Sequence, residues 1–260
     1  MKKLIFCLSL MTFACGERTA EKTADVPTEK VIEKKEFPEK IIFSSLDSVP
    51  VYANLYHCND TAPVIVLCHQ ARFNKFEYHK IAETLCAKGY NCLAIDQRSG
   101  GPIVETFNET MLKAKEKGKP VDFLDAEQDI VAAVNFASKK YRKKLILWGS
   151  SYSSTLVLYI AIVNDEVDAV ISFSPGDYFV KEKGALTEKL AAFKKPMFLT
   201  SSKEESVELS QMLSKTKLGD KQLQFIPKAP GEHGSRALWK TSESNEEYWA
   251  AINSFLASVN

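Results

Sequence analysis

This sequence has almost no net charge, because 34 lysines and arginines nearly balance 33 aspartates and glutamates. A formal charge of +1 over 260 residues creates no overall field that would attract a nucleic acid or an anionic membrane. The chain also lacks a basic patch with interleaved aromatic residues, and it has no long run of one charge sign. We therefore do not expect it to bind nucleic acid.

The cysteines lack the spacing of a metal site. Four of the six lie in the main body of the chain, at Cys58, Cys68, Cys86 and Cys92. No CxxC pair or accompanying histidine pattern resembles a zinc site, so no metal is implied. Cys68 follows a buried apolar run and is interpreted as a small hydrophobic residue. Cys86 and Cys92 are the one pair that we consider for a disulfide.

The N-terminus lacks an apolar run long enough to cross a bilayer, which takes about 20 residues. It has instead Met1-Lys2-Lys3 followed by a short apolar stretch, Leu4–Ala14, which has the shape of a secretory signal peptide. The residues that follow resemble the lipobox of bacterial lipoproteins, with Ala14 directly before Cys15, although Thr12 stands where that family usually has leucine.

This resemblance implies that residues 1–14 are a signal peptide, that Cys15 carries lipid, and that the protein is exported to the cell envelope and anchored to a membrane. The alternatives are ordinary signal cleavage and retention of the segment as a membrane anchor. Cys7 is a weaker lipidation candidate, because no small residue directly precedes it. Up to Lys40 the chain is rich in Glu, Lys, Thr and Pro, which predicts a flexible tether over residues 15–40. A charged helix around Glu29–Glu36 is the alternative.

From residue 41 to 260, strand-like and helix-like blocks alternate, which predicts one α/β domain with a mostly parallel central sheet and helices on both faces. The expected strands are Ile41–Phe43, Val49–Tyr56, Val64–Cys68, Asn91–Asp96, Leu145–Trp148, Ala169–Phe173, Pro196–Thr200 and Gln222–Ile226. The expected helices are Phe76–Lys88, Phe123–Tyr141, Ser154–Val163, Leu209–Lys215 and Glu246–Val259. Ser99–Pro120 breaks the alternation and is expected to be a loop.

The strongest chemical signal is Gly149-Ser150-Ser151-Tyr152-Ser153, which joins a buried strand directly to an apolar helix. This is the context of a G-x-S-x-G nucleophile elbow, whose tight turn needs small residues two before and two after the serine. Gly149 meets the first requirement, and Ser153 replaces the second glycine with another small residue. The sequence therefore predicts Ser151 as the nucleophile.

A serine nucleophile needs a base, and the chain order of this fold places a histidine last. His233 is the one histidine after Ser151, in a loop between the last strand and the last helix. We therefore predict that His233 is the base. The oxyanion hole is expected from the backbone amides of Tyr152 and of Ala71, or of Gln70 in place of Ala71. His69 precedes the nucleophile and is interpreted as a loop-shaping residue.

Together these motifs resemble the dienelactone-hydrolase-like branch of the α/β-hydrolase superfamily over Ile41–Val259. The carrying residues are Leu67–Gln70, Gly89–Gly101, the elbow and the pair His233-Gly234. The resemblance implies the α/β-hydrolase fold, and it implies structural roles for Asp96 and Arg98. Two departures stand out: Gln70 replaces a common glycine, and Ser151 stands where dienelactone hydrolases proper have cysteine.

The acid of the triad is expected after the strand Pro196–Thr200, where members of the superfamily place it a few residues beyond a small residue. The loop there reads Ser201-Ser202-Lys203-Glu204-Glu205. We favour Glu205, with Glu204 and Asp177 as alternatives.

These residues predict a serine hydrolase, esterase-like or peptidase-like, that cleaves a small-molecule or peptide acyl substrate through an acyl-enzyme intermediate without a cofactor. The alternatives are a non-catalytic lipid-anchored binding protein on a hydrolase scaffold and a lyase or transferase with this fold.

Overall fold

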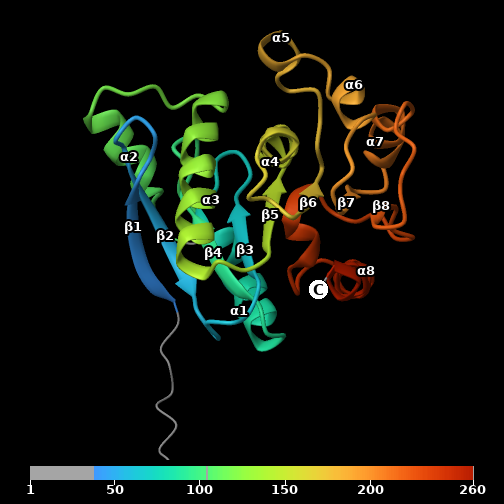
Figure 1. Cartoon of the computed structure of the whole chain (residues 1–260), viewed down its shortest axis with the longest axis horizontal. Helices are drawn as coiled ribbons and strands as arrows, with labels where there is room; N and C mark the ends of the chain where they lie inside the picture. Colours follow the sequence, from blue (N-terminus) through green and yellow to red (C-terminus); the bar gives the residue numbers. More distant parts are fainter. Residues whose placement is uncertain (1–37, 104, 260) are drawn as a thin grey trace, which may run out of the picture. The chain divides into compact units, whose positions relative to one another are not determined.

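Eight strands form a single sheet in the order β1-β2-β4-β3-β5-β6-β7-β8 (Figure 1). The computed structural model describes residues 38–103 and 105–259. The strands are β1 Glu39–Ser44, β2 Pro50–Tyr56, β3 Val64–Cys68, β4 Asn91–Ile95, β5 Leu145–Ser150, β6 Ala169–Phe173, β7 Met197–Thr200 and β8 Gln222–Phe225. The strands β4, β3 and β5 to β8 run parallel, while β2 runs antiparallel to both β1 and β4. The predicted mostly parallel sheet is confirmed.

Helices connect these strands. The α-helices are α1 His79–Ala87, α2 Glu109–Glu116, α3 Glu127–Tyr141, α4 Tyr152–Val163, α5 Val180–Lys183, α6 Leu186–Leu190, α7 Ser206–Met212 and α8 Asn245–Val259. Three short 3-10 helices are η1 Lys75–Tyr78, η2 Leu124–Ala126 and η3 Gly234–Leu238. None of the helices within residues 38–103 and 105–259 is long and apolar enough to cross a membrane.

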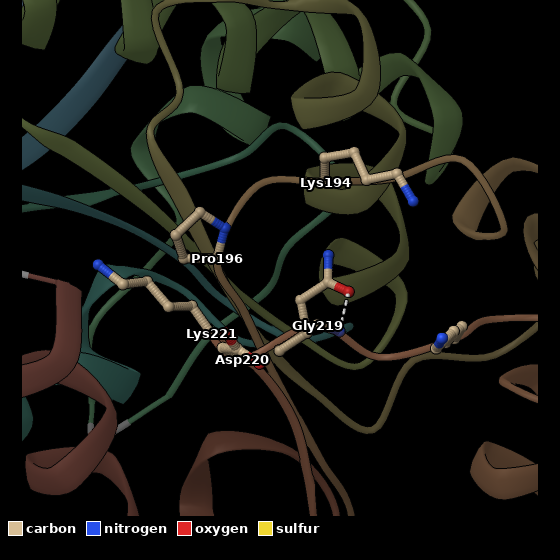
Figure 2. A pocket seen from close by; sticks show the side chains of 7 residues that line it. Lys194, Pro196, Gly219, Asp220 and Lys221 are labelled. Carbon is tan, nitrogen blue, oxygen red and sulfur yellow. Dashed lines mark hydrogen bonds between the residues drawn. The ribbon is translucent and has the colours of Figure 1, made fainter.

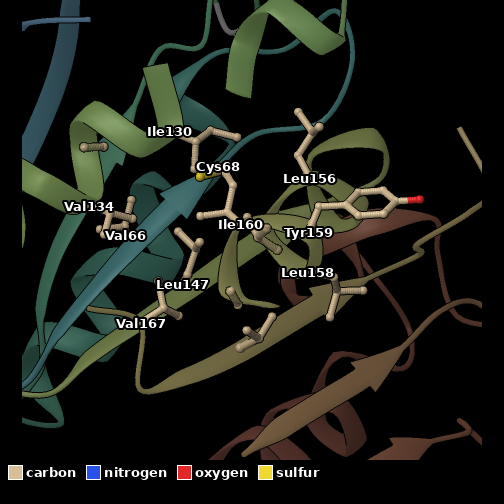
Figure 3. Packing of buried hydrophobic residues seen from close by; sticks show 14 of the residues in the cluster. Val66, Cys68, Ile130, Val134, Leu147, Leu156, Leu158, Tyr159, Ile160 and Val167 are labelled. Carbon is tan, nitrogen blue, oxygen red and sulfur yellow. The ribbon is translucent and has the colours of Figure 1, made fainter. Parts of the chain in front are cut away.

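Alternate residues of each central strand pack on opposite faces of the sheet, because successive side chains of a strand point to opposite sides. On one face Val64 and Val66 pack in a core with α3 and α4, part of which Figure 3 shows. On the other face Ile65 and Leu67 pack in a second core with α1 and α8. Helices therefore cover both faces of the sheet, as predicted. A central strand that is buried on both faces has a continuous apolar sequence, because neither set of its side chains contacts water.

The chain order reverses between β3 and β5, and this positions the site. β3 continues through α1 to β4 on one side, whereas β5 continues through α4 to β6 on the other. In a parallel sheet such a reversal opens a crevice at the carboxyl ends of the two strands, where ligands bind. Cys68 at the end of β3 pairs with Gly149 in β5, so the segments that follow them emerge side by side.

One expected loop contains a helix. Ser99–Pro120 was predicted to be irregular, but α2 forms within it, and the Asn108 side chain caps its start by accepting a hydrogen bond from the Met111 amide at 2.8 Å. Only Thr110 and Ala114 of this helix are buried, so the sequence lacks an apolar stripe. The helix expected at Leu209–Lys215 is also shifted toward the N-terminus and begins at Ser206.

Asp96 and Arg98, for which the family resemblance implies structural roles, are both buried and form ion pairs with residues of neighbouring segments. Arg98 is fully buried, and its guanidinium pairs with Asp129 and Asp47 at 2.7 Å each. Asp96 is also fully buried, and it pairs with the Lys75 ammonium at 2.7 Å. A buried charge is tolerated only when it is paired in this way, so both residues have structural roles.

The predicted signal peptide, the lipidated Cys15 and most of the tether fall in residues 1–37, outside the described residues. The first strand begins at Glu39, two residues before the expected start of the domain at Ile41. No disulfide joins Cys86 and Cys92, the pair that we considered from the sequence.

Candidate active site

Ser151 occupies the sharp turn between β5 and α4, with φ of 57° and ψ of −128°. A positive φ is uncommon for a residue with a Cβ atom, and such strain is characteristic of a nucleophile elbow. A Cβ atom on Gly149 would lie 2.5 Å from the Ser153 carbonyl oxygen, so the turn excludes any larger residue there. The sequence requirement for small residues therefore has a direct steric cause.

Ser153 stands where the motif usually has a second glycine, and its hydroxyl is engaged in the turn. The hydroxyl oxygen accepts a hydrogen bond from the Ser150 amide at 3.0 Å. It lies 2.8 Å from the Cys68 carbonyl, to which the hydroxyl donates. The departure from glycine thus ties the elbow to the end of β3.

His233 lies between Ser151 and Glu205, although the three residues come from separate loops. Its Nε2 is 2.7 Å from the Ser151 hydroxyl oxygen, and its Nδ1 is hydrogen-bonded to Glu205 Oε1. The loops follow β5, β7 and β8, which are parallel strands whose carboxyl ends meet at one edge of the sheet. The structure therefore brings the predicted nucleophile, base and acid together in the geometry of a Ser-His-acid triad.

Glu205 is held as a carboxylate by three donors. One oxygen contacts His233, and the other accepts hydrogen bonds from the Ser174 hydroxyl at 2.7 Å and the Ser202 amide at 3.1 Å. Burial alone would raise the pKa of Glu205, but hydrogen bonds from His233 and Ser174 outweigh it and lower this pKa to about 2. The alternatives Glu204 and Asp177 are exposed. Of the three candidate acids, Glu205 is the one that contacts His233.

Two backbone amides near Ser151 are candidates for the oxyanion hole. Tyr152 is the first residue of α4, where amides have no acceptor within the helix. The Gln70 amide donates to Glu77 Oε2 at 2.7 Å and is therefore engaged. This leaves the Ala71 amide, in the loop after β3, as the second donor that the sequence predicted.

The remaining histidines have other contacts. His69 is fully buried, and its Nε2 accepts a hydrogen bond from the Gln97 amide at 3.0 Å, which joins the loops after β3 and β4. His57 contacts the Tyr141 hydroxyl, and His79 contacts the Tyr56 hydroxyl. These positions fit the loop-shaping interpretation of His69 and leave His233 as the histidine at the nucleophile.

Two residues at the site were missed by sequence reasoning. Ser174, at the end of β6, donates to Glu205 and accepts a hydrogen bond from the Gly234 amide at 3.0 Å. Glu77, in η1, is buried and accepts a hydrogen bond from the Ser150 hydroxyl at 2.7 Å. No local motif marks either residue, because each acts through partners far away in the sequence.

A recess at the opposite edge of the sheet has different chemistry. It has a volume of about 350 Å³ and lies before β7 and β8, where Lys194, Pro196, Asp220 and Lys221 line it (Figure 2). Its lining contains no serine, cysteine or histidine. Within residues 38–103 and 105–259, no group of three His, Cys, Asp or Glu side chains is arranged to hold a metal ion.

Solved structures share this fold. The esterase Pf2001 of Pyrococcus furiosus superposes with a TM-score of 0.65 at 18% identity, over 86% of this chain and 93% of that chain. A dienelactone hydrolase from Anabaena variabilis gives a TM-score of 0.62 at 17% identity, over 86% and 99% of the two chains. An acylaminoacyl peptidase from Pyrococcus horikoshii gives 0.61 at 17% identity, over 86% of this chain and 42% of that chain. At these identities the likeness shows the α/β-hydrolase fold alone.

Comparison with curated proteins gives no significant match. The family comparison is informative, because the dienelactone hydrolase family matches residues 51–222. That range spans most of the chain and contains β2 except for Pro50, the strands β3 to β7, the elbow and Glu205. Sequence, fold and family agree, and the chain belongs to the dienelactone hydrolase family of hydrolases.

Proposed function

We propose that this protein is a serine hydrolase that cleaves an ester, thioester or amide bond through Ser151, His233 and Glu205. The observation that carries the proposal is the unbroken chain of contacts from the Ser151 hydroxyl through His233 to Glu205. Serine in place of the cysteine of dienelactone hydrolases proper favours an esterase-like or peptidase-like reaction. The structurally similar proteins include an esterase and an acylaminoacyl peptidase, which supports the same class of reaction.

Acylation begins at the hydroxyl of Ser151. Its oxygen attacks the substrate carbonyl carbon while its proton passes to Nε2 of His233, which is 2.7 Å away. Glu205 accepts a hydrogen bond from Nδ1–H of His233 and stabilises the imidazolium that forms. The negative oxygen of the tetrahedral intermediate accepts hydrogen bonds from the Ala71 and Tyr152 amides. When the intermediate collapses, His233 gives its proton to the leaving group, and an acyl-Ser151 ester remains.

Deacylation repeats these steps with water. His233 takes a proton from a water molecule, whose oxygen attacks the acyl carbon, and the Ser151 oxygen then leaves and regains the proton. The net reaction consumes one water and releases an acid and the leaving group. In both half-reactions the proton is carried by Nε2 of His233.

The proposal predicts measurable ester hydrolysis by the purified protein. A panel of p-nitrophenyl esters of increasing acyl length, with the matching thioesters and anilides, gives kcat/KM for each bond type. Hydrolysis of at least one series, lowered at least about a thousandfold in Ser151→Ala, is the expected result. Binding of these compounds without release of product would instead favour the non-catalytic alternative, and a product other than the free acid would favour a transferase or lyase.

We also propose that the protein is exported and lipid-anchored through Cys15. The support is the positive start of the chain, the short apolar stretch Leu4–Ala14, and the small residue directly before Cys15. Such an anchor would place the hydrolase domain beside a membrane in the cell envelope, joined to it by a tether that extends to about residue 40.

Cys15→Ser is expected to abolish incorporation of a labelled fatty acid and to leave the protein soluble or trapped as the precursor. The reason is that the thiol of Cys15 is the lipidated atom in the pattern that this N-terminus resembles. Labelling with a clickable palmitate, followed by fractionation of the cells, measures both effects. Cys7→Ser is the matched control and should be labelled normally; equal labelling of Cys15→Ser would refute the anchor.

A further inference from the structure

The triad leaves unused a buried carboxyl group that lies directly behind it. Glu77, in η1, is 1% exposed. Its Oε1 accepts a hydrogen bond from the Ser150 hydroxyl at 2.7 Å, and its Oε2 accepts one from the Gln70 amide, also at 2.7 Å. Burying a carboxylate is costly unless it is paired or fully hydrogen-bonded. No part of the proposed reaction explains why this position carries an acid.

The two hydrogen-bond partners of the Glu77 side chain connect it to three segments of the site. Gln70 directly precedes Ala71, the proposed oxyanion donor, and Ser150 directly precedes the nucleophile. The third segment joins through Ser150, whose hydroxyl oxygen accepts a hydrogen bond from the Ser235 amide at 2.8 Å, two residues after His233. A Cβ atom on Gly234 would lie 2.5 Å from this same hydroxyl oxygen, so the three segments are closely packed.

We propose that Glu77 is a positioning residue that fixes the oxyanion loop, the nucleophile elbow and the histidine loop relative to one another. The inference rests on the proposed serine hydrolase function and concerns the same site. Glu77 acts through Gln70 and Ser150 and does not itself touch the reacting atoms. A displacement of the reacting groups by about 1 Å can lower the rate about a hundredfold. The gain in catalytic rate therefore offsets the free energy that it costs to bury the carboxylate.

The arrangement requires the ionised form of Glu77. Both oxygens face donors, and the Ser150 oxygen already accepts from Ser235, so an added proton would leave the Ser150 hydroxyl without its acceptor. Burial raises the pKa of Glu77 to about 7, partly offset by the hydrogen bonds from Gln70 and Ser150. Other titratable or charged groups that interact with it are Arg236, His233, Cys68 and Tyr78.

Glu77→Gln tests the inference, because glutamine keeps the shape but presents an NH₂ group to one of the two donors. We expect kcat for an ester to fall about 10- to 100-fold with little change in KM, since positioning acts on the transition state.

Thermal unfolding at pH 8 checks that the variant is folded. The pKa of Glu77 is raised from 4.5, so its ionisation destabilises the folded state as pH rises through about 7, and the neutral variant avoids this cost. If the melting temperature of Glu77→Gln is no lower than that of the wild type, a lower kcat does not reflect unfolding.

The pH profile gives a readout that a purely structural role would not change. Protonation of Glu77 should inactivate the wild type as pH falls, because it takes the acceptor away from the Ser150 hydroxyl. Glu77→Gln cannot take up this proton, so the loss of kcat/KM that accompanies protonation of Glu77, at a pKa of about 7, should be absent from the variant. Ser150→Ala removes a hydrogen bond that lowers the pKa of Glu77, so its acid limb should move to higher pH. This variant also decides the matter if Glu77→Gln fails to fold.

Glu83→Gln is the matched control, because Glu83 is a glutamate of the adjoining helix α1 that pairs with Lys80 at the surface. A kcat of Glu77→Gln within twofold of this control, or an unshifted acid limb in Ser150→Ala, would overturn the inference while the triad stands. Undiminished hydrolysis by Ser151→Ala would contradict the proposed function itself and this inference with it.

Discussion

Ser151→Ala is expected to lower kcat/KM for ester hydrolysis by about three to six orders of magnitude, as removal of triad residues does elsewhere. The variant loses the hydroxyl oxygen that lies 2.7 Å from His233 Nε2 at the strained turn, so no acyl-enzyme can form on this residue. The oxyanion amides remain and account for residual activity. Initial rates with a p-nitrophenyl ester at high enzyme concentration measure the loss.

Ser150→Ala is the control for this prediction, because it removes a hydroxyl one position from the turn. Its hydroxyl is fully buried and donates a hydrogen bond to Glu77. We expect a loss of roughly 3- to 10-fold, in line with the modest worth of one hydrogen bond. Similar activities in the two variants, or retention of activity by both, would show that Ser151 is not the nucleophile.

Glu205→Gln is expected to lower kcat at least a hundredfold with the fold intact. The carboxylate accepts a hydrogen bond from Nδ1–H of His233, which leaves Nε2 free to take the Ser151 proton. The amide NH₂ group of glutamine can instead donate to Nδ1 and favour the wrong tautomer. Glu204→Gln and Asp177→Asn are matched controls, since both carboxylates are exposed. A large loss in either control, with little loss in Glu205→Gln, would move the acid to that residue.

The titration of Glu205 adds a stability effect with a definite sign. Its pKa falls from the ordinary 4.5 to about 2 in the folded protein. The ionised group therefore stabilises the fold above about pH 4.5, and this contribution is lost as pH falls toward 2. Glu205→Gln should accordingly narrow the difference in melting temperature between pH 6 and pH 3 relative to the wild type.

The sheet and the elbow could be predicted from the sequence because their signals are local. Val64–Cys68 and Asn91–Ile95 are buried on both faces and therefore read as unbroken apolar runs. Gly149 and Ser153 are fixed by sterics within one turn. His233 needed only chain order, since it is the one histidine after Ser151.

The parts that escaped prediction depend on partners distant in the sequence. Glu77 and Ser150 are 73 residues apart, and Ser174 and Glu205 are 31 apart, so no spacing in the chain signals either pair. The sequence did not decide which of the neighbouring carboxylates Glu204 and Glu205 is the acid. In the folded chain, where β7 lies beside β8, Glu205 contacts His233 and Glu204 is exposed. Helix α2 was missed because only Thr110 and Ala114 of it are buried, so its sequence has no apolar stripe.

The central claim is that Ser151 is an activated nucleophile, and a fluorophosphonate probe tests it most directly. The probe phosphorus reacts with an activated serine oxygen and releases fluoride, so intact-mass and peptide mass spectrometry report one adduct and its position. We predict a single adduct on Ser151 in the folded protein, and none after heat denaturation or in Ser151→Ala. An adduct on another residue, or no adduct on a protein that hydrolyses esters, would contradict the account.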